Sequence, residues 1–264
     1  MHVPVPPQAA APTPGEPASP PCLLALDTAT ETTHIALELH GSVHAAAQAG
    51  GAQASAVLLP ALQQLLQVAG AGWPQVDAIA FGRGPGAFTG LRTATSVAQG
   101  LAFGLDKPVI VLDTLMAVAE DARMAGADAG CVWVANDARM GELYAAVYAH
   151  DARRGWQVLR EPALHTPAAW LEQLQGATGT ETPSACAGNA WHALGEALEA
   201  AARSAPVWPD ARPTGAALLA LARQAWTAGA LQDAASALPL YVRDKVAQTT
   251  AEREAARAAK AQAA

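Results

Sequence analysis

Short apolar runs alternate with longer amphipathic segments along most of this chain. The apolar runs are typical of buried strands and lie at 23–26, 76–81, 109–112 and 131–135. The amphipathic segments carry apolar residues at helical spacing, and we expect them to form helices at 55–69, 88–104, 168–174, 191–202 and 215–228. Strands that alternate with helices predict an α/β fold.

The first apolar run leads into a polar cluster and then into an alternating segment at 35–39. This pattern predicts a β-hairpin whose tip carries Asp27 and Thr28. A carboxylate beside threonine hydroxyls can hold a hydrated metal or a phosphate oxygen, but threonine is also an ordinary turn and strand residue. The sequence leaves both interpretations open.

A glycine-rich turn at 81–92 follows the second apolar run and opens the helix expected at 88–104. Such a turn allows close approach of the backbone to an anion or to another backbone. The candidates for a nucleotide or phosphate site are therefore the hairpin pair Asp27 and Thr28 together with the residues of this turn. These are Gly84, Pro85, Gly86, Thr89 and Gly90.

Two known phosphate motifs fit this turn poorly. A Walker loop would continue with Gly-Lys-Ser/Thr, whereas Gly90 is followed by Leu91. A dinucleotide fingerprint expects an acidic residue about 20 positions after its last small residue, but Asp113 lies about 26 positions beyond Ala87. The first motif is excluded, and the second is disfavoured.

Five segments together resemble the bacterial TsaB family, also called YeaZ, which takes part in the synthesis of threonylcarbamoyladenosine at position 37 of tRNA. The matching segments are 24–31, 82–92, 97–102, 137–144 and 241–247, in the order of the family. The resemblance implies the two-lobed, duplicated α/β fold of actin, the heat-shock ATPases and the sugar kinases, reduced in size. It also implies pairing with the catalytic paralogue TsaD and contact with the ATPase subunit TsaE through that complex. Whether the chain alone is a homodimer or a monomer stays open.

Catalytic relatives in this superfamily carry a His-x-x-x-His pair that binds a metal. The resemblance places those two positions at Thr114 and Val118, and neither side chain is a suitable ligand for a transition metal. We therefore expect no catalytic residue, no metal and no resident cofactor, although Asp27 and Thr28 leave weak nucleotide binding open. The alternative hypothesis is a nucleotide-binding enzyme of the actin-like ATPase or kinase superfamily.

The resemblance also places the partner interface on the first two long helices. Interface candidates are the apolar stripe of the first helix and the small-residue ridge of the second. They are Leu58, Leu62, Leu65, Gly90, Ala94, Ala98 and Ala102. The alternative is that the ridge packs against the sheet of its own lobe and belongs to the core.

The sequence also predicts how the chain divides into a tail, two lobes and a C-terminal segment. We expect a disordered Pro/Ala-rich tail at 1–21, an N-terminal lobe at 22–112 that binds the partner, and a C-terminal lobe at 113–212. Residues 213–264 should form a helix that packs back on the first lobe, followed by a fraying end.

Charge and cysteine content bear on partners and compartment. A net charge of −7 does not favour direct phosphate binding, so tRNA should be contacted only indirectly. The three cysteines are widely spaced, which predicts buried, reduced thiols and a cytoplasmic protein without a membrane span.

Overall fold

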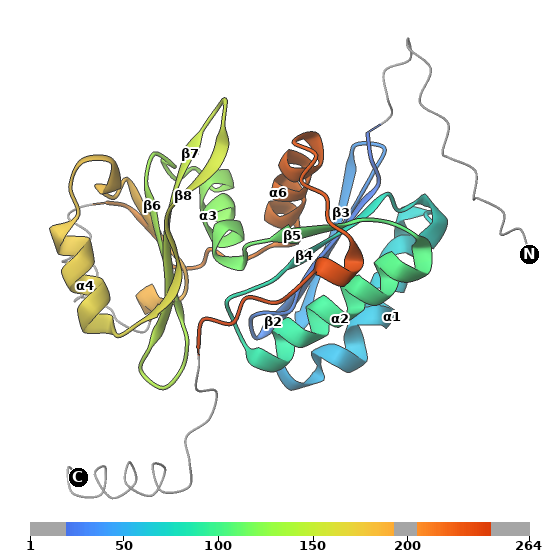
Figure 1. Ribbon diagram of the computed structural model, residues 1–264, viewed down its shortest axis with the longest axis horizontal. Helices are drawn as coiled ribbons and strands as arrows, with labels where there is room; N and C mark the ends of the chain where they lie inside the picture. The colour runs from blue at the N-terminus through green and yellow to red at the C-terminus, as the bar shows by residue number, and fades with distance from the viewer. Residues whose placement is uncertain (1–19, 193–204, 244–264) are drawn as a thin grey trace, which may run out of the picture.

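Two five-stranded sheets stand side by side in the computed structural model (Figure 1). The structure describes residues 20–192 and 205–243. Three expectations therefore lie outside the described residues, wholly or in large part. They concern the N-terminal tail, the helix at 191–202 and the end of the chain after residue 243.

The first sheet follows the strand order β3-β2-β1-β4-β5. Its strands are β1 Leu23–Asp27, β2 Thr32–Leu39, β3 Ser42–Ala49, β4 Ala78–Gly82 and β5 Val109–Leu112. β1 pairs with β2 in antiparallel register and with β4 in parallel register. The pair β2 and β3 is antiparallel, and the pair β4 and β5 is parallel. The predicted hairpin is thus confirmed.

The second sheet repeats this topology. Its strands are β6 Val132–Asp137, β7 Leu143–Asp151, β8 Gly155–His165, β9 Ala185–Ala187 and β10 Val207–Trp208. Their order is β8-β7-β6-β9-β10, with β6 and β7 antiparallel, β7 and β8 antiparallel, and the pairs β6/β9 and β9/β10 parallel. Each sheet therefore begins with three antiparallel strands in chain order and adds two parallel strands beside the first. This repetition confirms the duplicated fold.

Helices cover both faces of the first sheet (Figure 1). Helices α1, Ala54–Ala69, and α2, Phe88–Leu105, cover one face, and α6, Gly215–Thr227, covers the other. Helix α3, Thr114–Met124, lies between α6 and the second sheet, and α4, Pro167–Gly176, covers the far face of that sheet. The bounds of α1 and α2 agree with the predicted ranges within one residue.

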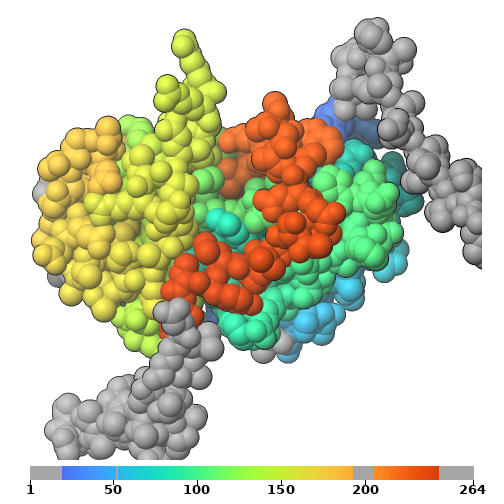
Figure 2. Space-filling view, viewed as in Figure 1, coloured from blue at the N-terminus to red at the C-terminus, as the bar shows by residue number. Residues whose placement is uncertain are grey.

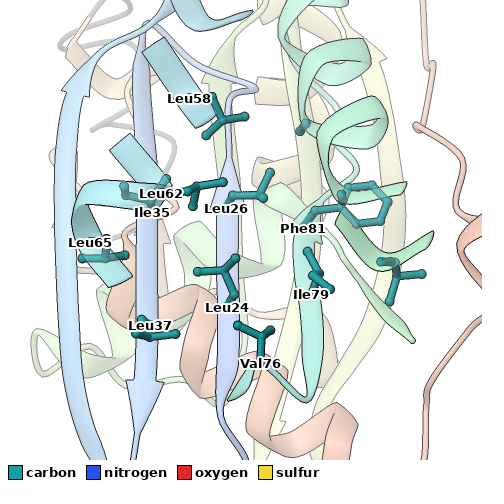
Figure 3. Close-up of a cluster of buried hydrophobic side chains, with 14 of the residues drawn as sticks. Leu24, Leu26, Ile35, Leu37, Leu58, Leu62, Leu65, Val76, Ile79 and Phe81 are labelled. Carbon is teal, nitrogen blue, oxygen red and sulfur yellow. The ribbon is translucent and has the colours of Figure 1, made fainter. Parts of the chain in front are cut away.

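Leucines of α1 point into the core of the first lobe (Figure 3). Leu58 and Leu62 are fully buried and pack with β1 and β2 residues such as Leu24 and Ile35. The small residues of α2 lie in the same core. Six of the predicted interface residues have side chains buried in it, and Gly90 of α2 is buried as well. The six are Leu58, Leu62, Leu65, Ala94, Ala98 and Ala102.

The prediction that these six side chains face a partner is therefore wrong. A sheet face must be covered to remove its apolar side chains from water. The leucine stripe of α1 and the alanine ridge of α2 provide that cover within this chain.

Helix α6 crosses β1 and β2 at close range. A Cβ atom on Gly215 would lie 2.8 Å from the carbonyl oxygen of Ile35, so a side chain at this position would collide with the sheet. The chain then passes through the short turn Ala234–Ser236 and continues along α2 toward the second sheet (Figure 2). We call residues 237–243 the C-terminal strap.

All three cysteines, Cys22, Cys131 and Cys186, are free and buried, as predicted. Burial raises the pKa of Cys22 and of Cys131 to about 11, and that of Cys186 to about 12, so the thiols stay protonated and unreactive. None of the helices in the described part of the chain is long and apolar enough to cross a membrane.

Candidate functional site

The hairpin tip and the glycine-rich turn meet at the carboxyl ends of β1 and β4, as expected for neighbouring parallel strands. Asp27, the last residue of β1, is completely buried there. One of its carboxylate oxygens accepts a hydrogen bond from the Ala29 amide at 2.7 Å, and the other accepts from the Thr114 hydroxyl at 2.7 Å. Burial raises the pKa of Asp27 to about 6, although both hydrogen bonds oppose the shift.

The glycines of the turn are explained by packing against this hairpin. A Cβ atom on Gly90 would lie 1.9 Å from the Thr28 carbonyl oxygen, and one on Gly86 would lie 2.5 Å from the Ala29 carbonyl oxygen. The Thr28 hydroxyl donates to the Gly90 carbonyl oxygen at 2.6 Å and is buried. Close approach of two backbones, one of the two roles considered for this turn, therefore accounts for both glycines.

The predicted phosphate site does not assemble as a set of free ligands. Asp27, Thr28 and Gly90 use their polar groups within the chain, and the Gly84 amide donates to Thr114 at 3.1 Å. These four candidates stay a prediction as ligand groups, and in this structure the groups named here already have partners within the chain. Pro85 and Gly86 do line the cleft between the lobes, whereas exposed Thr89 lines a shallow groove on the outside of α2.

The cleft itself is narrow. The part lined by Thr30, Gly86 and Asn136 holds about 140 Å³, whereas small-molecule sites usually hold about 300–1,000 Å³. Arg139 of the second lobe reaches Glu31 of the first at 2.8 Å across it. The Tyr144 hydroxyl also spans the lobes and donates to the Gly86 carbonyl oxygen at 3.3 Å.

Thr114 and Val118, the two positions that the family resemblance placed at the metal-binding histidines, are both buried. Thr114 donates to Asp27 and accepts from Gly84, and Val118 lies in the core between α3 and the second sheet. Across residues 20–192 and 205–243, no group of three or more His, Cys, Asp or Glu side chains is placed to hold a metal ion.

The carboxylate of Asp113, the acidic residue of the disfavoured dinucleotide motif, also has hydrogen-bond partners within the chain. It caps α3 by accepting from the Leu115 and Met116 amides, and it accepts from the Tyr148 hydroxyl at 2.7 Å. Burial raises the pKa of this carboxyl to about 6. Its role is to begin a helix and to tie that helix to β7.

Sequence reasoning missed the C-terminal strap as a connection between the lobes. On the first lobe, Leu240 donates its amide to the Arg83 carbonyl oxygen at 2.8 Å, and the Tyr241 hydroxyl accepts from Arg92 at 3.1 Å. On the second lobe, the largely buried side chain of Arg243 pairs with Glu142 at 2.9 Å. The only sequence signal was the motif at 241–247, which does not say what the strap contacts.

Comparison with known proteins identifies the family. The chain is 35% identical to the tRNA threonylcarbamoyladenosine biosynthesis protein TsaB of Escherichia coli (strain K12) over 226 residues, which are 85% of this chain and 96% of that protein. The chain belongs to the TsaB family. TsaB of Haemophilus influenzae is 32% identical over 231 residues, which cover 85% of this chain and 94% of that protein.

A solved structure and a family model agree with this membership of the TsaB family. YeaZ from Pseudomonas aeruginosa superposes with a TM-score of 0.72 at 35% identity and covers 84% of this chain and 99% of that chain. The family model described as TsaD, tRNA N6-adenosine threonylcarbamoyltransferase, matches residues 45–261. The resemblance drawn from the sequence and the predicted fold class are confirmed. The chain is thus assigned to tRNA threonylcarbamoyladenosine biosynthesis.

Proposed function

We propose that this TsaB-family chain is a non-catalytic subunit that activates the paralogous subunit TsaD in threonylcarbamoylation of adenosine 37 of tRNA. One observation carries the proposal: Thr114 and Val118, at the positions of the metal-binding histidines, are buried and committed to packing and hydrogen bonds. The enzyme alternative requires a nucleotide site. The internally bonded carboxylate of Asp27, whose two oxygens accept from Ala29 and Thr114, argues against that alternative.

The outer face of α1 and α2 is our proposed TsaD interface. We define this outer face by Phe103 of α2, which is 86% exposed, together with Leu59 and Val68 of α1, which are 46% and 72% exposed. Leu59 and Val68 lie on opposite flanks of α1, because nine residues make about two and a half helical turns, so Phe103 is the central residue of this face. Large apolar side chains in such positions mark surfaces that a protein partner covers. They replace the buried stripe and ridge as interface candidates.

Further proposals concern the other members of the assembly and the division of the chain into lobes. We propose that the same face pairs two copies when TsaD is absent, and that TsaE joins through the TsaB and TsaD complex. The partner-binding lobe is 22–112 and the second lobe is 113–212. In the described part of 213–264, α6 packs on the sheet of the first lobe.

We expect Phe103→Arg to weaken binding to TsaD by about tenfold or more, because aromatic anchors dominate interfaces and a charge there must be desolvated. Folding should be spared, since this side chain is 86% exposed. Isothermal titration of TsaD measures the affinity, and a tRNA modification assay measures activation.

Val158→Arg is the matched control, because Val158 is an exposed apolar residue on β8 of the other lobe. Equal TsaD affinity of the two variants would contradict the proposed interface. Activity of the purified chain without TsaD would contradict the non-catalytic role.

We also expect tight tRNA binding only when TsaD is present. The net charge of −7 repels the phosphate backbone, so the isolated chain should give no shifted band in a gel titration at physiological salt. Addition of TsaD should produce one. A tight, salt-sensitive complex of tRNA with this chain alone would contradict the expectation.

A further inference from the structure

A wider part of the cleft lies between the start of α2, the turn from β6 to β7 and the C-terminal strap. We call it the strap hollow. It has a volume of about 300 Å³, and its wall is mostly apolar or aromatic. The side chains that form most of this wall are Phe88, Leu91, Met140, Tyr144, Tyr241 and Val242.

The turn that forms one side of the strap hollow has a left-handed backbone. Arg139 and Met140 adopt φ values of 63° and 56°, in the left-handed region that side chains other than glycine rarely occupy. Such backbone conformations are found in tight turns and at functional sites. Here the turn presents an arginine and a methionine at the edge of the hollow, where Met140 is 51% exposed. Exposed methionine is frequent on surfaces that bind varied apolar side chains.

Three arginines lie around the hollow, and carboxylates pair with two of them. Arg139 lines the hollow and keeps its side chain 68% exposed while it pairs with Glu31 and Asp137. Arg243 pairs with Glu142. Arg92 lies over the ring of Phe88 at 3.9 Å and forms no ion pair with any residue in the described ranges. Carboxylates of a ligand would be attracted to this rim.

Most polar side-chain groups in the wall already have partners. The Tyr144 hydroxyl donates to Gly86, and the Tyr241 hydroxyl accepts from Arg92. The Arg243 guanidinium donates to Ala138, to Glu142 and to the Met140 sulfur, while its buried Nε has no hydrogen-bond partner among the described residues. What remains open is apolar surface rather than groups that could read the edge of a nucleobase. An apolar side chain therefore fits this hollow better than a base.

We propose that the strap hollow binds a protein segment that presents one large apolar or aromatic side chain beside carboxylates. The apolar side chain enters between Met140 and Tyr241, and the carboxylates lie near Arg92 and Arg139. This site is separate from the outer face proposed for TsaD. The proposal therefore does not depend on whether TsaD binds that outer face.

Fluorescence anisotropy of the full chain with a labelled short peptide tests the proposal. The probe has a central tryptophan flanked by aspartate and glutamate, and a second peptide replaces those acids with lysine and arginine. We expect the acidic peptide to bind at least about tenfold more tightly, and to bind less tightly as salt rises.

Met140→Asp is the informative variant, because aspartate tolerates the left-handed backbone while its charge repels an acidic ligand. We expect it to weaken binding of the acidic peptide about tenfold. Met140→Asn, which removes the thioether without adding charge, should have a smaller effect in the same direction. Met124→Asp is the matched control, since Met124 at the end of α3 is 50% exposed and lies far from the hollow in sequence.

Three results would overturn the proposal. One is equal affinity for the acidic and basic peptides, and another is unchanged binding in folded Met140→Asp. The third is tighter binding of a single-stranded RNA oligonucleotide with the same dependence on Met140, which would assign the hollow to nucleic acid.

Discussion

Ala98→Arg is expected to unfold the protein or to leave it barely stable. Ala98 is fully buried in α2 against the first sheet, with Ala94 and Ala102 on the same ridge. An arginine there would overpack the core and bury an unpaired charge, and together these effects should lower the free energy of unfolding by more than about 4 kcal/mol. This is a large part of the roughly 5–15 kcal/mol that stabilises a typical domain.

Thermal melting followed by circular dichroism measures the effect. The matched control is Gly100→Arg, two residues further along α2, where the position is exposed and a Cβ atom would meet nothing within 4 Å. The control should melt like the parent chain. If Ala98→Arg also melted like the parent and lost only TsaD binding, the interface originally predicted for this ridge would be restored.

The error over Ala98 shows what a periodic pattern can and cannot predict. The spacing of Leu58, Leu62 and Leu65 locates the helix and its apolar face, and both are found in the structure. The spacing does not say whether that face is covered by the same chain or by another. Phe103 and Val68 are exposed, and they were not predicted as interface residues because they do not break the helical spacing of the apolar positions.

Elements and duplication were the predictable part of the fold. Alternation of apolar runs with helical spacing is local, and so the ranges of α1, α2 and α6 follow from it. The family resemblance supplied the duplication, which appears as two sheets of the same strand order.

The site was less predictable, because its chemistry depends on contacts between distant residues. Asp27 and Thr28 resemble ligand groups until Thr114 and Gly90 are seen to satisfy them. The closure of the cleft by Arg139 and Glu31 joins residues 108 positions apart. No spacing within one segment could have indicated these pairs.

Asp27 should make the stability of this protein fall as the pH rises from about 4 to about 6. Its carboxyl is fully buried, and folding raises its pKa from 3.8 to about 6. Below pH 3.8 the group is protonated in both states. Between the two values the unfolded chain loses this proton while the folded chain keeps it, which favours unfolding. Above pH 6 both states are ionised, and the accumulated loss reaches about 3 kcal/mol.

Asp27→Asn removes this titration and keeps an oxygen for the Ala29 amide, while its own amide can donate to Thr114. Urea unfolding from pH 4 to pH 7.5 should show the variant gaining stability relative to the parent as the pH rises, with most of the gain complete near pH 6. Asp106→Asn serves as the control, because Asp106 is an exposed residue at the end of α2 with a left-handed backbone that asparagine also tolerates. The control should follow the parent at every pH. A stability difference between Asp27→Asn and the parent that is constant over this range would mean that Asp27 ionises inside the folded protein as readily as in the unfolded chain, and that the Thr114 and Ala29 hydrogen bonds fully offset its burial.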